Sequence, residues 1–448
     1  MKSKLMTILV LCLATLLMPG VAVAGETTTI DAGDTSFILV CASLVMLMTP
    51  GLALFYGGMV RRKNVLSTIM LSFIVMSVVS IIWVLYGYTL AFGPDIKSFI
   101  GGLDHLFLKG VGVEPAGGTI PHLLFMVFQL MFALITVAII SGSIAERMRF
   151  SAFLAFIVIW TSLVYAPLAH WVWGGGWLMQ LGALDFAGGT VVHISSGVTG
   201  LVAALVIGKR KGYGSEPILP HNLPMTVLGA ALLWFGWFGF NAGSALSASG
   251  LAVSAFTVTQ IAAAAGGLSW VLSEWLHHGK PTVLGCISGV VAGLVAITPA
   301  AGFVGAMSAL VIGLMVGPIC YFAVAVIKTK IGYDDSLDAF GIHGVGGTLG
   351  AIATGLFANL SVNEAGANGL FYGDASLLLK QLIGVGATIL FAALATFIIL
   401  KLISYFIPLR VSSDDEVIGL DISVHGENAY ADSYDFPMGA ANKAVRTL

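Results

Sequence analysis

The chain has 448 residues, of which 58% are hydrophobic and only 9% are charged, and its mean hydropathy is +0.99. Soluble domains carry about 25% charged residues, so this composition excludes a water-exposed globular surface and indicates an integral membrane protein. The net charge of -2 provides no basic field for nucleic acid, and four cysteines without a C-x-x-C pair suggest neither a disulfide framework nor a thiolate metal site.

The first 24 residues predict a cleaved signal peptide. Lys2 and Lys4 precede the apolar run MTILVLCLATLL, and Ala22-Val23-Ala24 is an A-x-A cleavage pattern. An uncleaved first transmembrane helix is the alternative. The shortness of the run and the polar stretch ETTTIDAGD after it favour the signal peptide.

Eleven apolar runs of bilayer-spanning length follow. They cover roughly residues 35–60, 65–92, 121–145, 150–170, 186–207, 223–246, 251–277, 282–299, 302–327, 338–359 and 376–404. Continuous runs rather than alternating patterns exclude a β-barrel, so we expect an all-α integral membrane fold. Residues 25–404 then form the membrane domain, and residues 405–448 form a C-terminal tail.

Lysine and arginine gather in alternate loops. The loops after the odd-numbered runs hold Arg61, Arg62, Lys63, Arg147, Arg149, Lys209, Arg210, Lys211, Lys280, Lys328 and Lys330. The loops after the even-numbered runs hold Lys97 and Lys109, and Lys380 begins the last run. The positive-inside rule therefore predicts a multi-pass cytoplasmic (inner) membrane protein with its mature N-terminus outside and its tail in the cytoplasm.

Two of the apolar runs share a spaced motif. Asp185 precedes His193 by eight residues and Asp335 precedes His343 by eight, and both stretches read D-x7-H-x3-G-x2-G. The histidines lie five runs apart, and an odd offset inverts the direction of crossing. This pattern predicts an inverted repeat of five plus five helices, with an eleventh helix outside it.

Such a repeat brings its equivalent positions together near the middle of the membrane. We therefore expect the imidazoles of His193 and His343 to face one another. Two unrelated core histidines bonded to backbone carbonyls are the alternative. A symmetry-related pair of ionisable groups at membrane depth favours a functional role.

At these residues the sequence resembles the Amt/Mep/Rh ammonium transporter family, in its bacterial Amt branch. The resemblance is carried by DFAGGTVVHISSGVTGL (185–201), FGIHGVGG (340–347), TPGLALFYGGMVRRKN (49–64), FQLMFALITVAIISGSIAER (128–147) and GWFGFNAGSA (236–245). It extends from about residue 33 to about residue 430, and only the residues after Ala431 match nothing in the family.

The resemblance implies a homotrimer in which each subunit has its own narrow pore between the two five-helix halves. It also implies a twin-histidine pore, an aromatic recruitment site and a phenylalanine gate. Carried over residue by residue, recruitment falls on Phe132, Trp173 and Ser244 with Asp185 nearby, the gate on Phe128, Phe132 and Phe240, and the pore pair on His193 and His343. The segment GLDISVHGENAY (419–430) resembles the family's regulatory tail, which implies a PII-type signalling partner.

The chemistry of these residues suits ammonium or its analogue methylammonium. Aromatic faces attract a cation, and the hydroxyl of Ser244 can accept an N–H. An interfacial aromatic belt is the alternative for Trp171, Trp173 and Trp177, and the resemblance overrides it for Trp173 only. For Asp185 we favour a helix cap with a long-range electrostatic role over a direct ion ligand, because conduction requires weak binding. Asp335 should cap its own helix in the same way.

We therefore expect ammonium transport in which the ion is recruited at the outer site and deprotonated, ammonia passes an apolar pore lined by the histidine pair, and the proton can move separately. Two other functions stay open. One is an electroneutral ammonia gas channel, and the other is an ammonium sensor with a vestigial pore. About 40 residues follow the last run, too few for a soluble output domain. We expect no enzymatic activity and no cofactor, because no nucleophile–base pair, metal cluster or nucleotide motif is found.

Overall fold

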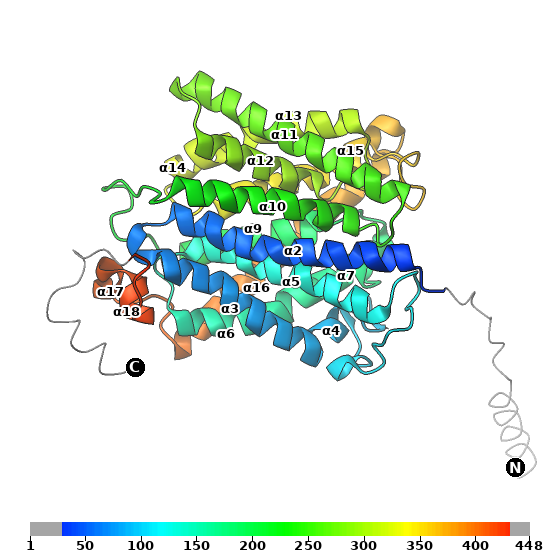
Figure 1. Ribbon diagram of the computed structural model, residues 1–448, viewed down its shortest axis with the longest axis horizontal. Coiled ribbons are helices and arrows are strands. Elements are labelled where there is room, and N and C mark those ends of the chain that lie inside the picture. Colours follow the sequence, from blue (N-terminus) through cyan, green and yellow to red (C-terminus); the bar gives the residue numbers. More distant parts are fainter. Residues whose placement is uncertain (1–28, 431–448) are drawn as a thin grey trace, which may run out of the picture.

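Long apolar helices lie side by side in the computed structural model, which describes residues 29–430 (Figure 1). Ten of the described segments are long and apolar enough to cross a membrane. They are Ala32–Met59, Arg62–Phe92, His122–Ile144, Phe150–Leu181, Gly189–Ile207, Leu223–Gly243, Gly250–His278, Ala306–Ile331, Phe340–Phe357 and Ala375–Phe406. The predicted signal peptide at residues 1–24 and the tail after Ala431 lie outside the described residues.

The expected span at 282–299 is a shorter apolar helix, Val283–Ile297, of 15 residues. At 1.5 Å per residue it is about 22 Å long, less than the hydrocarbon thickness of about 30 Å. The prediction of a largely helical membrane protein is confirmed. The count of eleven crossings stays a prediction.

Several of these segments are interrupted helices. The α-helices are α2 (Ala32–Met59), α3 (Val65–Ile82), α4 (Tyr88–Phe92), α5 (His122–Ile144), α6 (Phe150–Trp160), α7 (Ala166–Trp173), α8 (Trp177–Leu181), α9 (Ser195–Ile207), α10 (Leu223–Gly243), α11 (Gly250–His278), α12 (Val283–Ile297), α13 (Ala306–Phe322), α14 (Lys328–Ile331), α15 (Val345–Phe357), α16 (Ala375–Phe406), α17 (Ser413–Ile418) and α18 (Leu420–His425). The π-helical turns are η2 (Trp83–Gly87), η4 (Thr161–Tyr165), η5 (Gly189–Ile194), η6 (Ala323–Ile327) and η7 (Phe340–Gly344). The 3-10 turns are η1 (Arg62–Asn64), η3 (Leu106–Leu108) and η8 (Leu370–Tyr372), and β1 (Asp95–Ile96) pairs antiparallel with β2 (Ile100–Gly101).

The π turns follow the predicted repeat in part. The fourth and ninth expected spans contain η4 and η6, and the fifth and tenth begin with η5 and η7, so both pairs lie five spans apart. The turn η2 in the second span has no counterpart in α11. π-helical turns are frequent at functional sites, and here two of them carry the histidines. The inverted repeat as a whole stays a prediction.

Glycines of the repeated motif allow the two histidine-bearing segments to approach each other. A Cβ at Gly197 would lie 2.6 Å from the Cα of Gly344, and a Cβ at Gly347 would lie 3.0 Å from the Cβ of His193. Larger residues at these points would push the segments apart. Small residues at membrane helix crossings generally allow such close approach.

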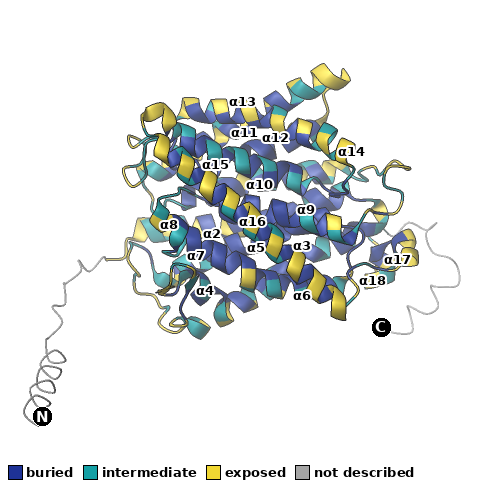
Figure 2. Ribbon diagram, turned by 180° about the vertical axis from the view of Figure 1, so that it is seen from behind, coloured by how far each residue is buried: buried dark blue, intermediate teal, exposed yellow. Residues whose placement is uncertain are grey.

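Burial separates a central helix from the perimeter. In α5, 83% of the most apolar window is buried, whereas in α16 the share is 33%. Figure 2 shows exposed residues running along α16, α6 and α13, and these include large apolar side chains such as Leu390, Phe397 and Met307. An apolar perimeter of this kind is the surface that a bilayer covers.

At one end of the helices a buried ion network joins the basic loops, and we call this the basic end. Glu146 accepts from Arg61 at 3.1 Å and from Arg210 at 2.9 Å, and Arg210 also binds Asp334 at 2.8 Å. Arg147 donates to the Asp334 carbonyl at 2.5 Å. Burial raises the pKa of Glu146, but the guanidinium groups of Arg210 and Arg61 outweigh it and hold that pKa below its usual value.

The short helices α17 and α18 dock at the basic end, beside α3 (Figure 1). Asp421 accepts from the backbone amides of Leu66 and Ser67 at 3.1 and 2.8 Å, and Asn64 accepts from the Leu420 amide at 2.8 Å. The described tail is therefore folded against the loops that hold the ion network.

Candidate functional site

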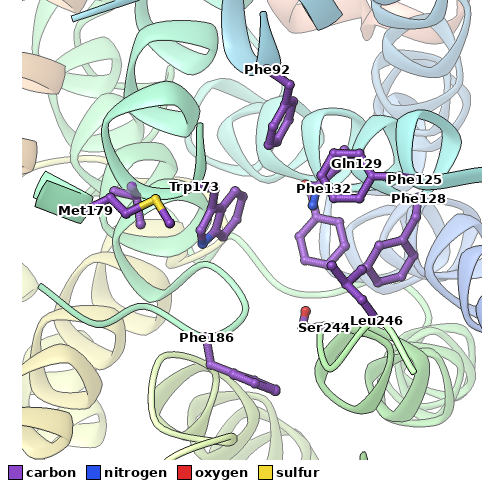
Figure 3. Close-up of a pocket in the computed structure, with 11 residues that line it drawn as sticks. Phe92, Phe125, Phe128, Gln129, Phe132, Trp173, Met179, Phe186, Ser244 and Leu246 are labelled. Carbon is purple, nitrogen blue, oxygen red and sulfur yellow. The ribbon is translucent and has the colours of Figure 1, made fainter. Parts of the chain in front are cut away.

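A cavity of about 190 Å³ lies at the opposite end of the helices, which we call the aromatic end (Figure 3). It is lined by Phe92, Phe125, Phe128, Gln129, Phe132, Val172, Trp173, Met179, Phe186, Ser244 and Leu246. We call it the aromatic pocket. It brings together Phe132, Trp173 and Ser244, three residues that are far apart in the sequence and that were predicted to share one site.

Aromatic rings close the inner end of this pocket. Phe132 and Phe240 stack with ring centroids 4.3 Å apart and an interplanar angle of 30°. Phe128 meets Phe132 edge-on at 5.0 Å, so the three predicted gate residues form one cluster. Phe132 and Phe240 are 2% and 0% exposed, which means that nothing passes between them without a rotation of the rings.

Trp173 is fixed by two contacts. Its ring meets Phe132 edge-on at 5.8 Å, and its indole N–H donates to the Asp185 carbonyl at 2.9 Å. The ring therefore lines the pocket while its N–H donor is engaged at Asp185. Trp171, by contrast, is not among the lining residues, is 4% exposed, and its indole N–H donates to the Phe99 carbonyl at 2.8 Å.

The carboxylate of Asp185 is used as a cap. It accepts from the amides of Gly188, Gly189 and Thr190 at 2.8, 2.6 and 2.7 Å, and it also binds the Thr190 hydroxyl. Gly188 has φ +115°, which favours glycine and turns the chain back toward this carboxylate. This is the geometry of a helix cap. Both carboxylate oxygens already accept hydrogen bonds at the start of η5, which leaves them poorly placed to bind a cation.

Two polar side chains reach into the otherwise aromatic pocket. The hydroxyl of Ser244 donates to the Phe240 carbonyl at 2.9 Å, which leaves its lone pairs to accept. Gln129 also lines the pocket, and its buried Oε1 accepts no hydrogen bond from any described residue. Sequence reasoning missed Gln129. An amide within an apolar run is a detectable signal, but its direction depends on the helix rotation.

Below the phenylalanine cluster the interior is almost closed. The next cavity has a volume of about 10 Å³, and its apolar lining includes Ile135, Leu233 and Val291. A cavity needs roughly 10–15 Å³ on this measure to hold one water molecule. The space beneath Phe240 is therefore limited to about one molecule of that size.

His193 and His343 supply the polar atoms of this narrow cavity. Their Nδ1 atoms lie 3.2 Å apart, and their rings stack at 5.2 Å with an angle of 25°. Trp237 stacks on His193 with ring centroids 5.3 Å apart. The two segments that carry the motif thus bring the Nδ1 edges of the imidazoles together, and neither ring is bonded to a backbone carbonyl of residues 29–430.

The contact between the two Nδ1 atoms restricts the protonation of the pair. One Nδ1 must carry the hydrogen and the other must accept it. The buried Nε2 of His193 has no hydrogen-bond partner among residues 29–430. If His193 accepts at Nδ1, its Nε2–H can donate into the cavity; if it donates at Nδ1, its Nε2 can accept.

The counterpart of Asp185 in the second half of the chain forms a smaller cap. Asp335 accepts from the Phe340 amide at 2.7 Å, at the same spacing of five residues as the Asp185–Thr190 bond. Its other oxygen, Oδ1, is buried and has no partner among the described residues. A cap is present, but it lacks the four additional donors that surround Asp185, which are the Gly188, Gly189 and Val191 amides and the Thr190 hydroxyl.

Comparison with known proteins reveals extensive similarity. A sequence model of the Ammonium Transporter Family matches residues 36–430. An ammonium transporter of Bacillus subtilis is 62% identical over 404 residues, covering 90% of this chain and 99% of that protein. Ammonium transporter Amt1 of Archaeoglobus fulgidus is 51% identical over 399 residues, covering 89% and 99%.

Solved structures give the same result. Saccharomyces cerevisiae Mep2 aligns with a TM-score of 0.82 at 36% identity and covers 92% of this chain and 94% of its own. A sensor Amt protein aligns with a TM-score of 0.82 at 29% identity, covering 88% and 98%.

Proposed function

The chain belongs to the Ammonium Transporter Family, and we propose that it moves ammonium as ammonia plus a separately handled proton through the passage described above. The observation that carries the proposal is the order in which three features follow one another from the aromatic end inward. An aromatic pocket with two polar acceptors comes first, a stacked phenylalanine pair follows, and a cavity of about 10 Å³ with two imidazoles comes last.

The aromatic pocket suits a small cation with N–H donors. The faces of Phe132 and Trp173 contribute roughly 0.5–2 kcal/mol as water is removed. Ser244 and Gln129 can replace two of the lost hydrogen bonds to water. These groups attract the ion without a bare carboxylate, so binding stays weak enough for release.

The cavity beneath the gate favours a neutral molecule over the ion. A charge in an apolar cavity without a counter-ion carries a large desolvation penalty, and no described carboxylate lines this cavity. Ammonia is small enough for it and can both donate and accept. Deprotonation at or above the phenylalanine gate therefore precedes passage, and the proton follows another route.

The histidine pair gives the neutral molecule a polar contact at depth. Two imidazolium groups 3.2 Å apart would repel strongly in an apolar surrounding, so the pair holds one shared hydrogen at Nδ1 and stays neutral or singly charged. Asp185 acts by fixing the start of η5 and the ring of Trp173, and its charge is felt at the pocket over a distance.

Sidedness and partners follow from the charge pattern and the tail. The basic end faces the cytoplasm and the aromatic end faces outward, in agreement with the loop lysines and arginines. The functional unit is a homotrimer. A PII-type signalling protein binds at the basic end, where the segment around 419–430 lies.

The decisive experiment is uptake of radiolabelled methylammonium together with current in liposomes that contain only this protein. We expect saturable uptake with an accompanying current. Uptake without current would instead support an electroneutral gas channel, and the absence of saturable uptake would support a sensor. Ser244→Leu should raise the KM several-fold, whereas Ser247→Leu, outside the aromatic pocket, serves as the matched control.

A further inference from the structure

A buried histidine lies behind the aromatic pocket and takes no part in the pathway described so far. His170 on α7 is 0% exposed. Its Nδ1 lies 2.9 Å from the Ala91 carbonyl oxygen, and its Nε2 lies 2.8 Å from Oδ1 of Asp95. Ala91 belongs to the last turn of α4 and Asp95 to β1.

Both neighbours of the imidazole are acceptors. A backbone carbonyl cannot donate, and a carboxylate donates only when it is protonated. The hydrogen bond from His170 lowers the pKa of the Asp95 carboxyl below its usual value, so Asp95 is ionised at neutral pH. A neutral imidazole would leave one of these two contacts without a hydrogen, whereas an imidazolium supplies a hydrogen to both. The Ala91 carbonyl, at a helix C-terminus, is a suitable second partner for a cation.

This pair joins two elements that each carry an aromatic residue lining the pocket. Phe92 follows Ala91 directly, and Trp173 lies three residues after His170 on the same helix. Figure 3 shows Phe92 and Trp173 both pointing into the cavity. A shift of α7 relative to α4 would therefore change the separation of these two rings.

Further bonds tie the β1–β2 hairpin to the same turn. The Trp171 indole donates to the Phe99 carbonyl at 2.8 Å, and the Trp177 amide donates to the Ser98 carbonyl at 2.9 Å. These bonds are neutral and insensitive to protonation. The pair formed by His170 and Asp95 is the charged element among them.

We propose that His170 and Asp95 are positioning residues for the ammonium-binding pocket, and that His170 does this as a buried imidazolium. The inference rests on the proposed function, because it concerns the affinity of that same pocket. Other charged groups nearby do not replace Asp95. The carboxylate of Asp185 is engaged at the start of η5, and Lys97 lies exposed in the hairpin turn.

Two substitutions of Asp95 and one of Asp104 test this proposal with the full chain reconstituted in liposomes. Asp95→Ala leaves His170 neutral with only the Ala91 bond, and the KM for methylammonium should rise about fivefold with little change in maximal rate. Asp95→Asn should restore a KM near that of the parent, because the asparagine amide can donate to the Nε2 of a neutral imidazole. Asp104→Asn, an exposed carboxylate at the same end, is the matched control and should behave as the parent.

A second measurement reads the protonation state directly. Solid-state NMR of protein labelled with 15N-histidine, assigned with His170→Gln, should show both ring nitrogens protonated at pH 7 in the parent and one in Asp95→Asn. A neutral His170 in the parent, or an unchanged KM in Asp95→Ala, would overturn the inference. Loss of all uptake in the parent would refute the proposed function instead, while the NMR result would still stand for the ion pair.

Discussion

Replacement of either central histidine by alanine should slow ammonium-driven transport about tenfold or more. The substitution removes a polar contact from a cavity of about 10 Å³ and leaves the partner's Nδ1 without its 3.2 Å neighbour. An unsatisfied buried polar group costs roughly 1–3 kcal/mol, and each 1.4 kcal/mol corresponds to about a tenfold change in rate. Because His193 and His343 act through one shared hydrogen bond, the double variant should be little slower than either single variant.

The assay is methylammonium uptake with current in liposomes, and purified protein is checked for assembly by size. His277→Ala is the matched control, because that histidine bonds Tyr321 near the end of α11 and lies outside the passage. Parental rates and unchanged selectivity in both single variants would refute the reasoning. Strictly additive losses in the double variant would also refute the shared hydrogen bond.

Three further predictions concern the rest of the molecule. Gln129→Leu removes the free acceptor of the aromatic pocket and should raise the KM for methylammonium about fivefold without changing the maximal rate, as measured by initial uptake. Glu146→Gln leaves Arg210 and Arg61 short of a counter-charge and should lower the free energy of unfolding by about 3 kcal/mol. Because the folded pKa of Glu146 lies below its ordinary 4.5, its stabilisation is present above that pH and is lost on acidification, so thermal unfolding of the variant should depend less on pH below about 4.5. Deletion of residues 405–448 should abolish pull-down of a PII-type protein, and retained binding would move that surface to the basic loops.

The helical segments were predictable because a helix that crosses a bilayer must be apolar along its whole length, and such long apolar runs are visible in the sequence. The third expected span at 121–145 matches α5 to within a residue or two. The contact between His193 and His343 was expected because their shared D-x7-H-x3-G-x2-G spacing was interpreted as an inverted repeat, and that repeat stays a prediction. The resemblance placed Phe132, Trp173 and Ser244 in one site before any geometry was known.

Other features required the structure. No known residue pattern predicts a π-helical turn, so the π-helical turns η5 and η7 around the histidines were not expected. No helix was expected in the tail, yet its described part contains α17 and α18. Its Ser412-x-x-Asp415 spacing is a capping box that could have indicated a helix start. Gln129 and His170 were missed because their proposed roles depend on contacts with residues that are distant in the sequence, and no local motif marks those contacts.

We expect selectivity against potassium from two features of the proposed passage that act together. A potassium ion must either keep its water, for which a cavity of about 10 Å³ has no room, or exchange that water for other ligands. The apolar wall supplies none, and the neutral imidazoles offer at most one free nitrogen each, far short of a full coordination shell. Ammonia needs only one or two hydrogen bonds, which the pair can provide. An alanine at His193 removes one of those bonds and also enlarges the cavity enough for water, so a slower ammonium flux and a new potassium current should appear in the same variant.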